Sequence, residues 1–168
     1  MKGSGEVRKT LISVIGAGAA TSEEEAAAEE VGREVAKRGA VLVCGGLGGV
    51  MEAACRGAKA EGGLTLGFLP GDGADCGNPH LDIALPTGLG EARNVLVARV
   101  SDGVVAVGGS LGTLSELAFA LKKRLPVASV GSWRLETERL PADALFLEAS
   151  SAADAIAFVM EHVRKAHR

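Results

Sequence analysis

The sequence is poor in aromatic residues and has no excess of positive charge. Its 168 residues include four Phe, one Trp and no Tyr, and 18 Lys and Arg stand against 21 Asp and Glu, for a formal net charge of −3. A protein that binds nucleic acid through its phosphates needs a basic surface, and one that holds single strands needs aromatic side chains on which the bases stack. We therefore expect no nucleic-acid partner.

Long apolar runs and paired cysteines are also missing. Each apolar run is interrupted within a few residues by Gly, Pro or a charge, whereas a transmembrane helix needs roughly 20 residues. The N-terminal residues MKGSGEVRKT are polar and contain no apolar signal-peptide stretch. Cys44, Cys55 and Cys76 are an odd number without a CxxC pair, which is typical of reduced thiols. These absences predict a cytoplasmic protein with no membrane partner.

Glycine and small apolar residues are abundant, with 24 Gly and 47% hydrophobic residues overall. Short β-branched runs alternate with longer Ala-rich amphipathic stretches, and glycines mark the junctions, which indicates repeated βαβ units. Strands that are apolar throughout imply a sheet covered on both faces. We predict an α/β fold: one domain over residues 1–168 with a single doubly wound, mostly parallel sheet and helices on both faces. Residues 1–8 are expected to be flexible.

The predicted elements follow this alternation. The strands are short apolar runs bounded by turn residues: 10–15, 41–44, 64–69, 81–85, 103–107, 126–130 and 144–147. The helices are the amphipathic stretches: 22–38, 49–61, 91–100, 113–124 and 151–165. Ser22 and Glu25 have the spacing of a capping box at the start of the first helix. In such sheets, ligands bind outside the carboxyl ends of the strands, where the glycine-rich turns lie.

The first glycine-rich turn excludes two common nucleotide sites. Gly16 and Gly18 begin a GxGxxG-like pattern, but Thr21 stands at its last position. A dinucleotide site also needs an Asp or Glu at the end of the second strand, where this chain has Cys44, so NAD is not expected. The chain contains no GxxxxGK[ST] motif, which excludes a P-loop ATPase.

The second turn contains Gly45, Gly46 and Gly49 and leads into a helix that carries Met51 and Glu52. A helix N-terminus behind such a turn directs backbone N–H groups at an anion. The alternative is that these glycines only let the helix pack closely against the sheet.

The third turn has the strongest signal for phosphate binding. It places backbone N–H groups and two hydroxyls at a predicted helix N-terminus, through Gly108, Gly109, Ser110, Gly112 and Thr113. Arg93 and Asn94 lie next to an earlier glycine-rich turn, and a guanidinium can hold a phosphate through two hydrogen bonds. The sequence thus predicts a phosphate site at the ends of neighbouring strands.

Two other interpretations compete for these residues. Ser110 sits in a GxSxG pattern, with Asp143 or Asp154 and then His162 following in the order of a serine hydrolase, although His162 falls on the predicted terminal helix. Thr113 and Glu116 form a T-x-x-E pattern, in which Glu116 would be only a helix cap.

Taken together, these motifs resemble the LOG-like group of Rossmann-type proteins, to which the label lysine decarboxylase is also attached. Arg93 stands nine residues before Asp102, and GGSLGTLSE (108–116) occupies the positions of the signature PGGxGTxxE. The segments GGLGGVMEAACRGA and GGLTLGFLP match the second turn and third strand of the group. The resemblance is strongest to the small branch that includes the molybdenum cofactor carrier protein.

The resemblance implies that a phosphorylated, nucleotide-like ligand binds at the carboxyl ends of the strands. Phosphoribohydrolysis is the leading function that it predicts, and a non-catalytic carrier is the alternative. In LOG enzymes the residues matching Arg93 and Glu116 are catalytic and cut the N-glycosidic bond of a nucleoside 5′-monophosphate. In the carrier-like branch, where Gly108 replaces the signature Pro and Asn94 replaces a Lys, the ligand is a pterin phosphate such as molybdenum cofactor. Either function implies a homodimer or higher homo-oligomer. The expected ligand-binding residues are Gly16, Gly18, Gly45, Gly46, Gly49, Met51, Glu52, Asn94, Gly108, Gly109, Ser110, Gly112 and Thr113.

No cofactor or metal is expected. A pyridoxal enzyme needs a Schiff-base lysine in its site, and none of the lysines lies in a glycine-rich turn, which argues against lysine decarboxylation. Cys76 and His80 are two candidate metal ligands without a second pair, whereas a structural zinc site needs four.

Overall fold

The computed structural model describes residues 8–166 and contains one seven-stranded sheet in which every pair of neighbouring strands is parallel. The strands are β1 (Leu11–Gly16), β2 (Val41–Cys44), β3 (Thr65–Leu69), β4 (Ile83–Pro86), β5 (Gly103–Val107), β6 (Val127–Val130) and β7 (Phe146–Glu148). The helices are α1 (Ser22–Lys37), α2 (Val50–Ala60), α3 (Asn94–Val100), α4 (Leu111–Lys122) and α5 (Ala152–Ala166), with 3₁₀ turns at Gly90–Arg93 and Thr137–Arg139.

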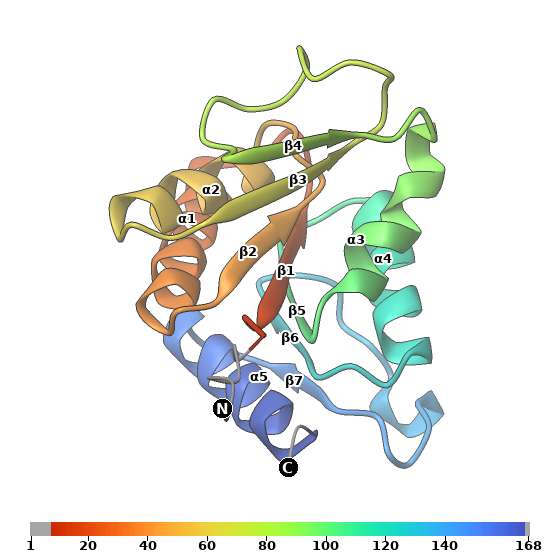
Figure 1. The fold of residues 1–168 in the computed structure, drawn as a ribbon. Coiled ribbons are helices and arrows are strands. Elements are labelled where there is room, and N and C mark those ends of the chain that lie inside the picture. Colours follow the sequence, from red (N-terminus) through yellow and green to blue (C-terminus); the bar gives the residue numbers. More distant parts are fainter. Residues whose placement is uncertain (1–7, 167–168) are drawn as a thin grey trace, which may run out of the picture.

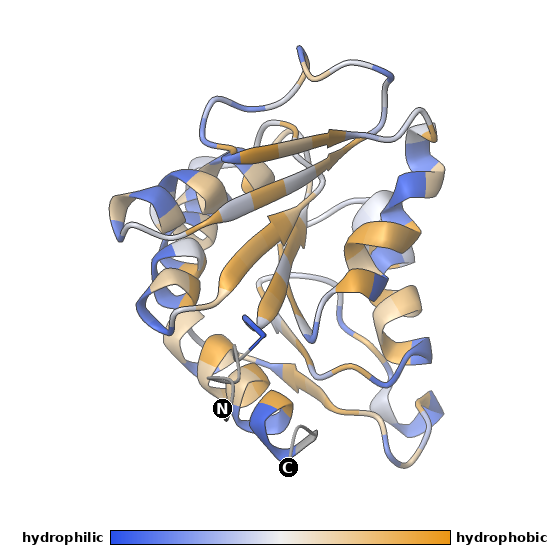
Figure 2. Ribbon diagram, in the orientation of Figure 1, coloured by the Kyte–Doolittle hydropathy of each residue, from blue (hydrophilic) through white to orange (hydrophobic). Residues whose placement is uncertain are grey.

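Helices cover both faces of the sheet, as the apolar strands predict. Helices α1, α2 and α5 pack on one face, and α3 and α4 pack on the other (Figure 1). Successive residues of β5 alternate between two cores: Val105 and Val107 face α1, α2 and α5, while Val104 and Ala106 face α3 and α4. Hydrophobic residues, in orange, predominate in the central strands, and hydrophilic segments, in blue, lie mainly on the helices (Figure 2). The Rossmann-like α/β class is therefore confirmed.

The strand order is β4-β3-β2-β1-β5-β6-β7. From β1 the chain builds outward in one direction as far as β4 and then returns to β5, on the other side of β1. Gly16 pairs with Val107 at the carboxyl ends of β1 and β5, so these two ends lie side by side. This reversal of direction separates the loops that follow neighbouring strands, and a ligand-binding crevice is expected there.

Most elements start or end within two residues of the predicted positions, α4 included, and two local predictions are wrong. Thr21, not Ser22, caps α1, because its extended backbone lets its hydroxyl accept from the Glu24 N–H while Glu24 accepts from the Thr21 N–H. The predicted helix at 91–100 divides into a 3₁₀ turn and α3. Helix α4 begins at Leu111, two residues before the predicted start.

The predicted flexible segment 1–8 lies outside the described residues except for Arg8, whose guanidinium pairs with Asp102 over 3.0 Å. Asp102 also accepts a hydrogen bond from the Leu11 N–H, at the amino-terminal edge of the sheet. None of the helices in the described part of the chain combines the length and the apolar character needed to cross a bilayer.

Candidate functional site

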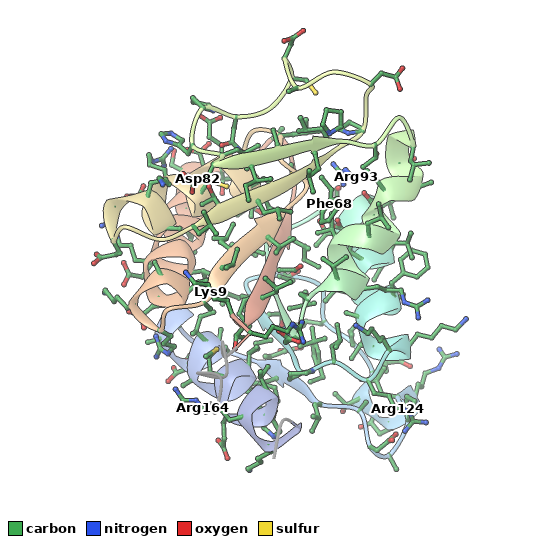
Figure 3. All side chains as sticks on the ribbon, in the orientation of Figure 1. Lys9, Phe68, Asp82, Arg93, Arg124 and Arg164 are labelled. Carbon is green, nitrogen blue, oxygen red and sulfur yellow. The ribbon has the colours of Figure 1, made fainter. Side chains whose placement is uncertain are left out.

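A cavity of about 270 Å³ lies at the carboxyl ends of the central strands, and we call it the Arg93 cavity. Figure 3 shows Arg93 near the ends of β3 and β4, beside the start of α3. The cavity is lined by residues from all three glycine-rich turns and from both helices of the α3–α4 face: Gly16, Gly18, Leu47, Met51, Pro70, Gly90, Glu91, Arg93, Asn94, Ser110, Gly112, Thr113 and Glu116.

The Arg93 guanidinium is buried with few hydrogen-bond partners. Its side chain is 8% exposed. Nη1 contacts the Asn94 side-chain oxygen, while Nε has no hydrogen-bond partner among the described residues. Burying a charged donor without an acceptor is costly, and an anion in the cavity would remove that cost. A guanidinium in this setting can donate hydrogen bonds to an anion in the cavity.

Two neighbours hold the guanidinium in position. Asn94 Nδ2 donates to Ser115 Oγ over 3.4 Å, which turns the amide oxygen of Asn94 toward Arg93. Gly45, after β2, provides the space, since a Cβ at that position would lie 2.7 Å from Arg93 Nη2 and 2.8 Å from Met51 Sδ. Gly45 therefore acts on the site through Arg93, although it does not line the cavity.

Glu116 faces Arg93 from α4. Its Oε1 is 3.7 Å from Arg93 Nη1, too far for a hydrogen bond, and its side chain is 7% exposed. Burial raises the pKa of Glu116 to about 7, and the nearby Arg93 charge offsets part of that rise. A carboxyl group with such a pKa exchanges its proton near neutral pH, so it can donate or accept one inside the cavity.

The N-terminus of α4 opens into the same cavity. Ser110 is the N-cap, and its backbone N–H donates to Thr113 Oγ1 over 3.3 Å. The predicted capping role of Glu116 is wrong, because a helix that begins at Leu111 places Glu116 beyond its first turn. The N–H groups of a first helical turn lack helical partners and attract anions.

The second turn serves mainly to pack α2 against the loop after β1. The Val50 N–H donates to the carbonyl of Ala17 over 3.1 Å, and a Cβ on Gly49 would collide with that carbonyl. A Cβ on Gly46 would lie 2.5 Å from the Leu69 side chain. Gly46, Gly49 and Glu52 do not line the Arg93 cavity, so their role in ligand binding stays a prediction. For the two glycines, the packing contacts above are a sufficient reason for the missing side chain.

Other predicted residues lie beside the cavity, and some lining residues were not predicted. Gly108 and Gly109 line a neighbouring cavity instead. The unpredicted lining residues are Leu47, Pro70, Gly90 and Glu91. Leu47, Gly90 and Glu91 belong to glycine-rich turns that the sequence does reveal, whereas Pro70 has no local signal that marks it as a lining residue.

The serine-hydrolase arrangement does not form. His162 Nδ1 interacts with the Phe158 carbonyl of its own helix over 2.8 Å. Asp154 binds the hydroxyls of Ser150 and Ser151 at the start of α5, and Asp143 pairs with Arg124. Since each candidate partner is engaged away from Ser110, no triad is assembled.

The three cysteines are free thiols. Cys44 and Cys55 are buried with their sulfur atoms 3.6 Å apart, and Cys76 is exposed. The hydrogen bond from the Cys55 thiol lowers the pKa of Cys44, and the same bond together with burial raises the pKa of Cys55.

Solved structures of two proteins that bind or carry molybdenum cofactor have the same fold as this chain. The molybdenum cofactor carrier protein of Chlamydomonas reinhardtii is 39% identical, with a TM-score of 0.83 over 94% of this chain and 99% of that one. The molybdenum cofactor binding protein of Rippkaea orientalis is 36% identical, with a TM-score of 0.81 over 96% of this chain and 99% of that one. An uncharacterized protein of Archaeoglobus fulgidus is 48% identical over 119 residues, which are 71% of this chain and 78% of that protein.

The family model that matches describes the SLOG cluster4 family, and the match extends over residues 9–160. This range includes every strand and helix from β1 to β7, together with Arg93, Glu116 and the three glycine-rich turns. The predicted LOG-like resemblance is confirmed, and the chain belongs to the SLOG cluster4 family.

Proposed function

We propose that this protein binds a phosphorylated pterin of the molybdenum cofactor type and acts as its carrier. The observation that supports this function best concerns the guanidinium of Arg93, which is buried and whose Nε has no hydrogen-bond partner among the described residues. It lines the Arg93 cavity together with the N-terminus of α4. A doubly charged phosphate monoester in the cavity would accept the hydrogen bonds that the guanidinium lacks. The similarity to two proteins described as binding or carrying molybdenum cofactor supports the pterin part of the ligand.

The phosphate would be held from two sides. Arg93 would donate from Nε and Nη2 in the planar arrangement that matches two phosphate oxygens. The backbone N–H groups of Leu111 and Gly112, together with the Ser110 hydroxyl, would donate from the α4 side. Glu116 in its neutral form would not repel the phosphate, so its raised pKa favours binding of an anion beside it.

Phosphoribohydrolysis is a second candidate function, favoured by a specific observation at Glu116. Its buried carboxyl group lies beside Arg93 and has a pKa of about 7, which suits a general acid or base. In that function Arg93 would orient a nucleoside 5′-monophosphate, and Glu116 would act on the attacking water or the ribose hydroxyls. The matches to carrier proteins favour the first function, since a carrier needs saturable binding and no reaction.

Binding and turnover can be separated with one protein preparation. We expect 6-hydroxymethylpterin phosphate to bind saturably in equilibrium dialysis, and AMP to yield no free adenine by chromatography. Arg93→Gln should weaken binding at least tenfold, because the phosphate loses a charged partner. Arg99→Gln is the matched control, since Arg99 is exposed on α3, the helix that follows Arg93.

Two results would contradict the carrier function. Release of adenine that disappears in Glu116→Gln would establish the hydrolase, the leading prediction from the sequence, instead of the carrier, which is the alternative there. Absence of both binding and release would exclude both functions. Formation of a homo-oligomer stays a prediction for either function.

A further inference from the structure

A second cavity, of about 380 Å³, adjoins the turn at residues 108–110, and we call it the Trp133 cavity. Its walls come from α1 and from the segment after β6, and include Glu24, Gly109, Ser132, Trp133 and Arg134. Gly109 lines this cavity and Ser110 lines the Arg93 cavity, so the two cavities border the same turn. A ligand with its phosphate at the N-terminus of α4 could therefore extend into the Trp133 cavity.

Trp133 provides a flat aromatic wall in a fixed position. Its Nε1 donates to the Ser110 carbonyl over 3.1 Å, which ties the indole ring to the residue that caps α4. It is the only Trp in the chain. Stacking of a heterocycle on an aromatic side chain is favourable and is a common way of holding a planar ring.

Glu24 provides acceptors on the opposite element. One carboxylate oxygen, Oε2, accepts from the Thr21 N–H over 2.8 Å, which holds the side chain at the start of α1. The other oxygen, Oε1, lies against Gly108, where a Cβ would collide with it. An ionised carboxylate only accepts hydrogen bonds and has room for more than one donor, so Glu24 can still accept from a ligand.

The rest of the lining is also polar. The Ser132 Oγ is buried and has no hydrogen-bond partner among the described residues. It can therefore donate to or accept from a ring substituent. A carboxylate beside an aromatic wall repels phosphate but suits a neutral ring that carries adjacent N–H groups. Arg134 also lines this cavity but is exposed, so the acceptor oxygens beside the indole ring are those of Glu24. We therefore place the phosphate beside Arg93 and the ring edge beside Glu24.

We infer that the Trp133 cavity binds a 2-amino-4-oxopyrimidine ring, the ring system shared by pterins and guanine. The ring face stacks on Trp133, and the ring N–H and the amino group donate to Glu24. Ser132 bonds a further ring atom. This inference rests on the proposed function, because the ring belongs to the ligand whose phosphate occupies the Arg93 cavity.

Fluorescence of the single Trp reports directly on this cavity. Three probes differ in one part each: GMP has the amino-pyrimidinone edge and a phosphate, IMP lacks only the amino group, and ribose 5-phosphate lacks the ring. We expect GMP to quench the fluorescence of Trp133 saturably. IMP should bind about tenfold more weakly than GMP, because it lacks one hydrogen bond to a charged group. Ribose 5-phosphate should bind, as measured by calorimetry, without quenching the fluorescence.

Two glutamates of α1 provide a matched pair of variants. Glu24→Gln keeps an oxygen that can accept from the Thr21 N–H but loses the charge, so GMP should bind about as weakly as IMP. Glu23→Gln alters an exposed residue of the same turn that does not line the cavity, and the tenfold difference between GMP and IMP should persist.

The possible failures are distinguishable. The ring subsite would be contradicted by equal affinity for GMP and IMP, or by binding of GMP without quenching. The phosphate site would still be supported if ribose 5-phosphate binds wild type and this binding is lost in Arg93→Gln. If none of the three probes binds by calorimetry while 6-hydroxymethylpterin phosphate still binds in dialysis, the ring subsite fails and the proposed function stands. If the pterin phosphate does not bind either, both fail.

Discussion

Arg93 and Glu116 face each other across the Arg93 cavity, with 3.7 Å between Nη1 and Oε1 and side-chain exposures of 8% and 7%. The pair is buried and within ion-pair distance, but the two atoms are too far apart for a hydrogen bond. Arg93 comes from the turn before α3 and Glu116 from α4, and the two helices pack together on one face of the sheet. Their packing therefore fixes the positions of both side chains in the wall of the cavity.

Burial of Glu116 predicts a loss of stability as the pH rises. At a pH well below 4.5, its ordinary pKa, the carboxyl is protonated in both the folded and the unfolded chain and favours neither. Between 4.5 and about 7 the unfolded chain releases the proton while the folded chain keeps it, so the free energy of unfolding falls until the pH passes about 7. Wild type should lose about 2 kcal/mol from this group between pH 5 and pH 8.

Glu116→Gln isolates this contribution. The amide does not titrate, so the variant should gain stability relative to wild type as the pH rises, by about the same 2 kcal/mol. Urea unfolding of both proteins at pH 5, 6, 7 and 8 measures it, and the other titrating groups cancel in the difference. Parallel curves for the two proteins would mean that Glu116 titrates at its ordinary pKa in the folded state.

The fold was predictable because its signals are local. Each buried strand is a short apolar run, and each helix has a periodic apolar face, so the sheet and its two layers of helices follow from the sequence. The start of α4 was harder to predict from the sequence. Ser110 and Thr113 can both act as N-caps in GGSLGTLSE, and the geometry of the turn decides in favour of Ser110.

The site was predictable only where its residues lie in glycine-rich turns. Arg93 and Glu116 follow from such turns and from the family signature. Contacts between distant segments leave no local signal: Gly45 makes room for Arg93, and Trp133 bonds to the Ser110 carbonyl. The burial that raises the pKa of Glu116 likewise depends on the packing of α3 against α4.

Gly45→Ala should weaken anion binding with little loss of stability. The added methyl group would lie 2.7 Å from Arg93 Nη2, and the guanidinium is the end of a flexible side chain that can move aside. Sulfate affinity by calorimetry should fall about tenfold, the loss expected for one charge-assisted hydrogen bond of about 1.4 kcal/mol.

Gly71→Ala is the control for this substitution, because a Cβ at Gly71 has no neighbour within 4 Å. Sulfate should bind that variant with wild-type affinity. If Gly45→Ala also binds sulfate normally, then Arg93 does not hold the anion in the position that we propose.

Gly108→Ala should destabilise the fold through Glu24. Gly108 has a φ of +53°, and a Cβ there would collide with the Glu24 carboxylate. The positive φ alone costs about 1 kcal/mol for a residue with a side chain. Displacing Glu24 from the Thr21 N–H costs about 1 kcal/mol more, because α1 loses part of its cap. We therefore expect a loss of about 2 kcal/mol in urea unfolding.

Gly131→Ala separates the two contributions. Gly131 has a similar φ of +56°, but a Cβ there has no neighbour within 4 Å, so only the loss of about 1 kcal/mol from the backbone is expected. Glu24→Ala should then cost less stability in the Gly108→Ala background than in wild type, because the cap is already displaced. Equal costs in the two backgrounds would show that Glu24 and residue 108 do not interact, and that Gly108 is required for its backbone conformation alone.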